Sequence, residues 1–442
     1  MQHASSPVPG RPRIFYGWWI VVAGAVVAFS SGPGQTYGFS TFIDSIIEDT
    51  GLERTSLSAL YAVGTGVSAA MVLAVSRLAD RYGVRRTLPL VALGVGLACI
   101  SMSMAQGAFV VFVSFSALRA LAQGSLTINT TVLTAQWFVR KRGRAMSLQG
   151  LGFPLSLAVI PLLARTLIDQ IGWREAYVVL GVMVWVLVIP LAFFVIRERP
   201  EEMGLFPDGA DGPPPGETAD AAARATATPD RRRVLTSLRF WWLALPLSTP
   251  ALVVTGLVFH QSAIMQEQGL GPTVAAATFV PMAVLSAGSA LVTGGLVDRF
   301  RPQVVFAASL LAMLAAMAMA LFINSLWQAV LYAGLLGMCS GIGQVVNSVT
   351  WAHFYGRFGL GRVQGAAVMV NIAASALGPL PLAALAGVFD SFRPGVAVMA
   401  LLPLVSIAAI LTARPPDGSR VGAQPSACGP TAGGAPCRPR RQ

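Results

Sequence analysis

Long apolar segments, separated by short polar breaks, follow one another along most of the chain. Twelve of them approach or exceed the roughly 20 residues with which an α-helix crosses the hydrocarbon core of a bilayer. The expected spans of the first half are 17–39, 55–76, 87–105, 109–137, 145–168 and 174–196. Those of the second half are 240–263, 273–297, 303–323, 326–352, 362–388 and 393–413. The pattern predicts an all-α integral membrane protein with 12 transmembrane helices.

The polar breaks contain a weak internal repeat that relates the two groups of six spans. The repeated pairs, at one constant offset, are Asp80-Arg81 with Asp298-Arg299 and Gly143-Arg144 with Gly361-Arg362. Because an even number of spans separates the copies, both halves have the same orientation in the membrane. Parallel repeats of this kind are typical of secondary transporters. We therefore expect two parallel six-helix halves, 14–196 and 240–413.

Charged, Pro-rich or Gly-rich segments lie outside these halves. Residues 1–13 are expected to be a cytoplasmic N-terminus, 197–239 a flexible cytoplasmic linker and 414–442 a disordered cytoplasmic tail. With both termini in the cytoplasm, most of the 31 Lys and Arg residues fall on the cytoplasmic side, which the positive-inside rule favours. The short loops and compact length indicate a bacterial inner (plasma) membrane.

The composition narrows the class of protein. Hydrophobic residues make up 55% and charged residues 11% of the 442 residues, and the mean hydropathy is +0.66, which excludes an ordinary soluble domain. The net charge of +12 does not indicate nucleic-acid binding, because the basic residues form short clusters between apolar segments. The sequence has no metal-ligand cluster, nucleotide-binding loop or nucleophile with a nearby base, so we expect no cofactor, no metal and no enzyme.

Polar side chains inside the spans concentrate in spans one, four, five, seven, ten and eleven. Such side chains are costly against lipid and face a cavity or another helix. At 100° per residue, Arg119, Gln123, Thr127, Thr130 and Thr134 form one stripe, and Ser340, Gln344, Asn347, Ser348 and Trp351 form another. We expect both stripes to face one cavity, with hydrogen bonding between helices as the alternative. The candidate substrate-binding residues are Arg119, Gln123, Asn129, Gln344, Asn347, Tyr37, His260 and Asn371.

Arg119 is the strongest of these candidates. It lies near the middle of span four, where insertion scales charge roughly 2.5 to 3.5 kcal/mol for Arg, and none of the 19 Asp and Glu residues lies in a span core. A substrate carboxylate could supply the missing anion by a bidentate contact. The alternative is a structural arginine bonded to backbone carbonyls or to Gln123. His260 is either a satisfied interfacial residue or a proton carrier, and Tyr37 either an interfacial anchor or a gate residue.

Two of the polar breaks resemble the loop signature of the major facilitator superfamily. They are Ser76-Arg-Leu-Ala-Asp80-Arg81-Tyr-Gly83-Val-Arg85-Arg86 and the degenerate copy Gly294-Gly-Leu-Val-Asp298-Arg299-Phe-Arg301. The first departs from the family by having Ser76 where Gly is usual, and the second lacks the later Gly. The resemblance implies two halves that rock around a midplane site, lined by the first and fourth helices of each half.

Further motifs resemble the monocarboxylate transporter group and its oxalate/formate antiporter relatives. They are Tyr16-Gly17-Trp18-Trp19, Tyr37-Gly38-Phe39, Trp137-Phe138 with Arg140-Lys141-Arg142-Gly143-Arg144-Ala145-Met146, and Gly378-Pro379 before Asp390. This resemblance implies transport of a small organic anion, first of all a monocarboxylate. We expect the protein to be a monomer surrounded by membrane lipids. The chain departs from the family because spans eight and eleven carry no charge and because Arg119 precedes Gly124 by five positions instead of four. Coupling to a proton, exchange for a counter-anion and uniport therefore remain open.

The paired loops also supply candidates for a cytoplasmic gate. The carboxylates of Asp80 and Asp298 could accept hydrogen bonds from N–H groups that open the helices after Gly361 and Gly143. The alternative is that they only balance neighbouring arginines. The candidate gating residues are Asp80, Arg81, Arg85, Asp298, Arg299, Arg144 and Arg362.

Two other functions remain open from the sequence alone. A multidrug or cationic-solute exporter would favour a carboxylate within the membrane, and the span cores contain none. A non-transporting membrane sensor is compatible with the long linker, although no signalling domain is recognisable. Ligand binding without uptake into vesicles would distinguish such a sensor from a transporter.

Overall fold

The computed structural model describes residues 15–210, 237–355 and 360–412, and these residues form helices and irregular segments without strands. Twelve helical segments are long and apolar enough to cross a membrane. The first six are Gly17–Gly34, Arg54–Ala79, Val84–Ser103, Ala108–Trp137, Arg142–Ile171 and Trp173–Phe194. The other six are Leu238–Phe259, Pro272–Val297, Pro302–Ala320, Leu326–Trp351, Val363–Phe389 and Phe392–Thr412. The all-helical architecture with twelve spans is confirmed.

Several spans are built from more than one helix. The first half contains α1 (Gly17–Phe29), the 3₁₀-helix η1 (Gly32–Gly34), α2 (Thr36–Ser40), α3 (Ile43–Thr50), α4 (Arg54–Tyr82), α5 (Val84–Ser103), α6 (Ala108–Leu118), the π-helix η2 (Arg119–Leu126), α7 (Thr127–Trp137), α8 (Arg142–Gly150), α9 (Gly152–Ile171) and α10 (Trp173–Phe194). The second half contains α13 (Leu238–Phe259), α14 (Gln261–Glu267), α15 (Pro272–Ala277), α16 (Phe279–Arg299), α17 (Pro302–Ala320), α18 (Leu326–Tyr355), α19 (Leu360–Leu377), α20 (Pro379–Phe389), α21 (Phe392–Met399) and α22 (Leu401–Thr412).

Each half has its own hydrophobic core, and the two cores exchange only a few side chains. Tyr37, Leu157 and Ile160 of the first half pack into the core of the second, whereas Phe259 packs into the core of the first. Large apolar side chains elsewhere point outward, as expected for helices that are surrounded by lipid. The halves are therefore two packed bundles in limited contact.

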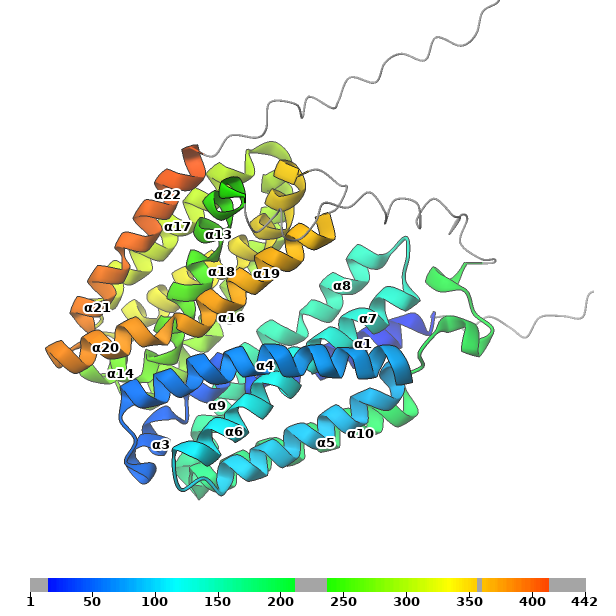
Figure 1. Ribbon diagram of the computed structural model, residues 1–442, viewed down its shortest axis with the longest axis horizontal. Helices are drawn as coiled ribbons and strands as arrows, with labels where there is room; N and C mark the ends of the chain where they lie inside the picture. Colours follow the sequence, from blue (N-terminus) through cyan, green and yellow to red (C-terminus); the bar gives the residue numbers. More distant parts are fainter. Residues whose placement is uncertain (1–14, 211–236, 356–359, 413–442) are drawn as a thin grey trace, which may run out of the picture.

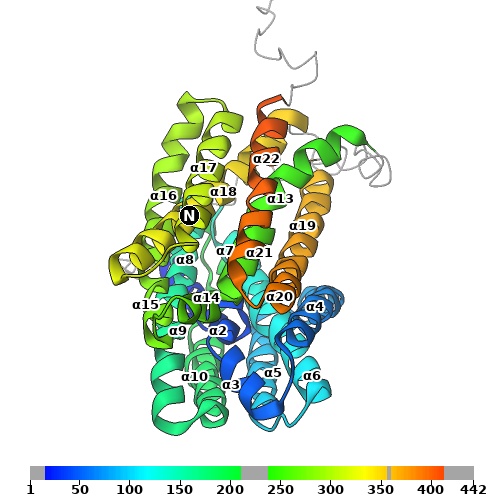
Figure 2. The same cartoon turned by 90° about the vertical axis from the view of Figure 1, so that its left-hand side faces the viewer.

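The two bundles meet at one end of the molecule. Figure 1 shows α4 close to α20 at one end and diverging from α19 toward the other. In Figure 2 the end where they meet faces the viewer, with α3, α14 and α20 around it. A Cβ added to Gly387 in α20 would lie 3.8 Å from the Thr55 hydroxyl oxygen of α4. We call this end the joined end and the opposite one the far end.

Spans one and eleven are broken. Span one, expected to be continuous over 17–39, ends its first helix at Phe29 and continues through η1 and α2, which corrects the prediction. The break brings Gly34 against span four, where a Cβ would lie 2.3 Å from the carbonyl oxygen of Leu118. Only glycine permits that approach. Span eleven is divided at Gly378, between α19 and α20, at the position of the Gly-Pro pair.

The first part of the segment expected to be a flexible linker has defined contacts. Residues 197–210 contain the 3₁₀-helices η3 (Pro200–Met203) and η4 (Pro207–Gly209). The Asp208 carboxylate accepts hydrogen bonds from the N–H groups of Val139, Arg140 and Lys141 at 3.0, 2.7 and 3.0 Å. This segment is therefore attached to the far end of the first half. The expectations for residues 1–13, 414–442 and the greater part of the linker lie outside the described residues.

Candidate functional site

A cavity of about 320 Å³ lies between the two halves. Its volume is at the lower end of the range for small-molecule pockets. Spans one, four and five of the first half and spans seven, eight, ten and eleven of the second contribute to its lining. Five of the predicted binding residues are among the lining residues: Tyr37, Gln123, Gln344, Asn347 and Asn371. The expectation of a shared central cavity thus corresponds to a real space between the bundles.

The polar lining forms two walls. The wall from the first half consists of Gln35, Thr36, Tyr37 and Gln123, and the wall from the second consists mainly of Gln344, Asn347, Asn371, Ser375 and Thr255. Apolar side chains from both halves, such as Phe153, Leu157 and Val258, complete the lining. None of the described lining residues is charged. The cavity can therefore offer hydrogen bonds from both halves together with apolar surface.

Arg119 lies directly behind the wall of the first half. Its side chain is only 3% exposed, and its Nη1 donates to the Thr36 hydroxyl oxygen at 3.2 Å. The guanidinium carbon lies 4.9 Å from the ring centre of Tyr61, whose hydroxyl is 2.7 Å from that of Thr36. The Nε atom is buried and has no hydrogen-bond partner. Arg119 therefore does not line the cavity itself but bonds to Thr36, which does.

A π-helix interrupts the stripe that was predicted for span four. The predicted stripe assumed a regular α-helix, but residues 119–126 form η2, in which each turn contains more residues. The Ser125 hydroxyl donates to the carbonyl of Ala120, five residues earlier, at 2.8 Å. Gln123 lines the cavity, whereas Arg119 packs against Tyr61 and Phe115. Periodicity alone could not reveal this change of register.

The far-end part of the predicted stripe bonds to a neighbouring helix instead of facing the cavity. Gln149 of α8 accepts a hydrogen bond from Thr134 and donates one to Thr130 at 3.0 Å. Asn129 is 2% exposed, and its amide nitrogen has no partner. It is not among the described lining residues of the cavity. For Thr130 and Thr134, bonding between helices was the correct alternative.

His260 forms a hydrogen bond at the break in span eleven. It is fully buried, and its Nε2 lies 3.0 Å from the carbonyl oxygen of Pro379. Because a carbonyl only accepts hydrogen bonds, Nε2 carries the proton and donates it. The ring also packs against Phe259 and Phe392. The structure thus places His260 outside the described lining of the cavity, at the joined end.

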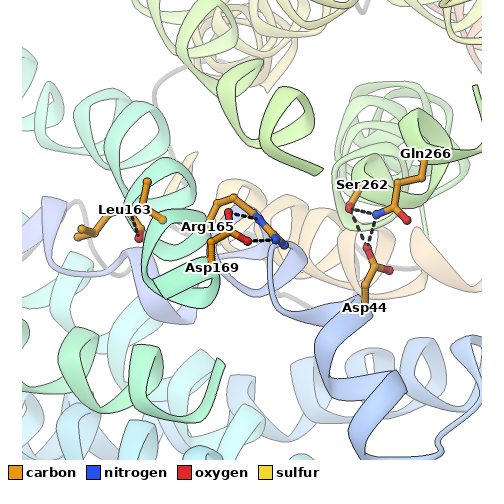
Figure 3. Close-up of polar contacts among 7 residues, drawn as sticks. Asp44, Leu163, Arg165, Asp169, Ser262 and Gln266 are labelled. Carbon is orange, nitrogen blue, oxygen red and sulfur yellow. Dashed lines mark hydrogen bonds and ion pairs between the residues drawn. The ribbon is translucent and has the colours of Figure 1, made fainter. Parts of the chain in front are cut away.

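A polar cluster at the joined end, which the sequence analysis missed, links the two halves. Asp44 of α3 pairs with Arg54 of the same half at 2.5 Å. Its other carboxylate oxygen accepts hydrogen bonds from Ser262 and Gln266 of α14 at 2.7 and 2.9 Å. Figure 3 shows these two side chains of the second half converging on Asp44. We call these four residues the Asp44 clasp.

The surroundings of Asp44 favour its charged form. Burial alone would raise the pKa of this carboxyl. The charge and hydrogen bond of Arg54 and the two donors from α14 lower it by more than burial raises it, so the pKa lies below its usual value. The clasp therefore contains a carboxylate at neutral pH. Charge-assisted hydrogen bonds of this kind are stronger than neutral ones.

The candidate gating residues lie at the far end of their helices. The side chains of Asp80, Asp298 and Arg362 lie outside the described part of the structure, so their pairing stays a prediction. Arg81, Arg85, Arg144 and Arg299 are exposed there. Asp208 is an acceptor in this region that the sequence analysis did not single out. Its signal was a Pro-Asp-Gly turn, which by itself does not identify a tertiary partner.

Comparisons with known proteins agree with this architecture. The family model described as Major Facilitator Superfamily matches residues 20–379 and 260–441. A solved structure of a bacterial homolog to the human lysosomal transporter Spinster, in an inward-facing and unoccupied conformation, is similar with a TM-score of 0.71 and 14% identity. The match covers 91% of this chain and 98% of that one. At such low identity the likeness shows the fold.

Curated relatives align with this chain over parts of different length. The 3-(3-hydroxy-phenyl)propionate transporter of Escherichia coli (strain K12) is 29% identical over 333 residues, which cover 73% of this chain and 78% of that protein. Monocarboxylate transporter 6 of Homo sapiens is 25% identical over 167 residues, or 37% of this chain and 32% of that protein. The alignments with four other curated relatives span 23% to 36% of those proteins.

Proposed function

Because the chain belongs to the Major Facilitator Superfamily, we propose that it transports a small organic anion with a single carboxylate across the membrane. Transporters of this superfamily rock two halves about a midplane site. In this proposal the cavity between the halves is the substrate site. The observation that carries the proposal is Arg119, a buried cation that contacts the cavity wall through Thr36 and has no ion-pair partner among the described residues.

The physical reason is the cost of a buried charge. A guanidinium that is removed from water without an anion loses solvation that the ring of Tyr61 and one hydroxyl only partly replace. A carboxylate bound beside Thr36 would lie close to this charge in a region of low dielectric constant, where attraction is strong. The names of two relatives agree with this chemistry, since one transports a phenylpropionate and the other monocarboxylates.

The proposal also assigns the two ends of the molecule to the two sides of the membrane. The positive-inside rule puts the far end, with its exposed arginines, in the cytoplasm of a cell whose inner membrane holds the protein. Both termini are then cytoplasmic. The joined end is extracellular, and the Asp44 clasp holds the halves together on that side. The transporter is then closed to the outside in this state, and a proton or a counter-anion could accompany the substrate.

Ligand-dependent thermal stabilisation of the purified protein tests the proposal. Monocarboxylates, dicarboxylates and lipophilic cations are compared on the wild type, Arg119→Gln, and Arg165→Gln as the control. Arg165 is an arginine of span five that pairs with Asp169 one turn away. We expect a monocarboxylate to raise Tm and its apparent Kd to weaken about 10- to 100-fold in Arg119→Gln, as for loss of a hydrogen bond to a charged group. Arg165→Gln should bind normally.

Uptake into proteoliposomes then separates transport from binding alone. A monocarboxylate that stabilises the protein should accumulate in exchange for the same acid loaded inside, and accumulation should fall in Arg119→Gln. Stabilisation by cations only, or equal carboxylate binding in wild type and Arg119→Gln, would contradict the anion site. Binding without any uptake would identify a sensor instead of a transporter.

A further inference from the structure

In the cavity wall of the second half, one contact fixes which atom of the Asn347 amide can bind a ligand. The indole N–H of Trp351 donates to Oδ1 of Asn347 at 2.8 Å. Because an indole can only donate, the amide oxygen of Asn347 must face it. The amide nitrogen, with two hydrogens, is then the group that Asn347 can offer to a ligand in the cavity, which it lines. This wall therefore favours a ligand atom that accepts hydrogen bonds.

Two further amides extend this wall. Gln344 lies nearly one turn before Asn347 on α18, and Asn371 faces the same cavity from α19. Beside Asn371, the hydroxyls of Thr255 and Ser375 lie 3.0 Å apart and bond to each other. The wall is thus made of neutral groups from three helices. It can bind a hydroxyl or a carbonyl without any change in protonation.

The absence of charge in the described lining limits what this wall can bind. A second carboxylate beside these amides would be removed from water without a cation close to it, which is costly. Arg119 is on the opposite half, behind Thr36. An ammonium group would likewise find no carboxylate among the described lining residues. A neutral polar group avoids both costs.

Between the walls, the cavity surface is apolar. Phe153 and Leu157 of α9 and Val254 and Val258 of α13 line it, and the Phe153 ring packs edge-on against Tyr37 at 5.7 Å. Such a surface suits a ring or a short hydrocarbon chain, which would bury its area there. The cavity therefore combines a cation behind the wall of the first half, neutral donors on the second half, and apolar surface from both.

We infer that the substrate is a monocarboxylate whose apolar body carries a neutral hydrogen-bond acceptor, such as a hydroxyl or a carbonyl, at the end away from the carboxylate. This inference rests on the proposed function for the carboxylate end. The amides of Asn347, Gln344 and Asn371 bind the distal group, and dicarboxylates are rejected. The carboxylate supplies affinity through Arg119, and the amide wall supplies selectivity among acids.

Three probes that differ only at the distal end test this inference: 3-phenylpropionate, the same acid with a ring hydroxyl, and the same acid with a ring carboxylate. Their apparent Kd values are measured by thermal shift on the wild type, Asn347→Leu and Asn371→Leu. Gln328→Leu is the matched control, because Gln328 is an amide of the same helix as Asn347 but lies near its first turn, outside the described lining. Asn371→Leu is needed because Asn347→Leu also removes the partner of Trp351.

We expect the ring hydroxyl to tighten binding to the wild type about 2- to 10-fold, the usual range for one neutral hydrogen bond. This gain should vanish in at least one of the two wall variants and persist in Gln328→Leu. The ring carboxylate should weaken binding by at least about 10-fold.

The failures of the two proposals are distinguishable. If 3-phenylpropionate binds in an Arg119-dependent manner but the hydroxyl has no effect, or the second carboxylate is tolerated, the amide wall is not a selectivity site and the anion site stands. If the hydroxyl effect persists in both wall variants, the distal group binds elsewhere and the inference fails. If none of the three acids binds, the proposed function fails, and this inference fails with it.

Discussion

The two ends of the molecule satisfy their polar groups in different ways. At the joined end, the Asp44 carboxylate of the first half accepts hydrogen bonds from Ser262 and Gln266 of the second. At the far end, two carboxylates bond within the first half: Asp208 accepts from the backbone of 139–141, and Glu198 accepts from the N–H of Val84 at 3.3 Å. Among the side chains that the structure describes, polar contacts between the halves are thus concentrated at the joined end.

This difference shows how two packed bundles can be held together by a few contacts that can still break. A few charge-assisted bonds and a few ring contacts hold the joined end, and partly exposed polar contacts of this kind are individually weak. At the far end, the bonds of Asp208 and Glu198 involve no group of the second half. Separation of the halves at the joined end would therefore leave each bundle intact, which alternating access requires.

The largest expected effect comes from removing the ring that crosses between the halves. Phe259 is 1% exposed and packs against Phe39 and Tyr61 of the first half, at 6.0 and 4.8 Å between ring centres. Buried Phe-to-Ala substitutions typically cost about 3–5 kcal/mol, and part of that cost falls only on the joined state. In Phe259→Ala, a cysteine introduced at Ser340 in the cavity should react much faster with an impermeant maleimide added from the joined-end side. An unchanged rate would show that the rings do not hold this end closed.

Loss of the clasp carboxylate should have a smaller effect of the same kind. Asp44→Ala removes the pair with Arg54 and both bonds from α14. Because the Asp44 side chain is about one third exposed, we expect roughly a 10-fold rise in the same labelling rate. Asp169→Ala is the control, since Asp169 pairs with Arg165 within α9, as Figure 3 shows. If both variants label alike, the clasp does not stabilise the joined end.

The clasp also predicts how this labelling depends on pH. Because the pKa of Asp44 is lowered in the joined state, its contribution is fully present above the ordinary carboxyl pKa of about 4 and is lost as the pH falls through the lowered value. Labelling in the wild type, corrected for the reactivity of the thiol, should therefore be constant from about pH 8 to about pH 5. A rise in labelling within that window, absent in Asp44→Ala, would show that the carboxyl protonates there.

The smallest effect is expected at the far end. Asp208→Ala removes the acceptor of three backbone N–H groups but leaves the contacts between the halves unchanged. Trypsin should cleave after Arg140 or Lys141 a few-fold faster, because the loop opens locally more often. Labelling at the joined end should stay at the wild-type rate. A change in that labelling would mean that the two ends are coupled through this loop.

The cavity shows how much the pattern of polar residues in the spans can predict about their positions. Tyr37, Gln123, Gln344, Asn347 and Asn371 line the cavity, because a polar side chain in an apolar span faces either a cavity or a neighbouring helix. The same rule does not choose between these two places. Thr130 and Thr134, which share the pattern, bond to Gln149 instead.

The sequence by itself determined the twelve spans, because apolar length is a local property that the bilayer selects directly. Its internal repeat and its resemblance to the superfamily, which the family model bears out, likewise needed only the chain. The tertiary structure alone decided the π-helix of span four, the contact of Arg119 with Thr36, the break at Gly34, and the pairing of Asp44 with α14. Each of these depends on contacts between residues far apart in the chain, and their geometry exists only once the helices have packed.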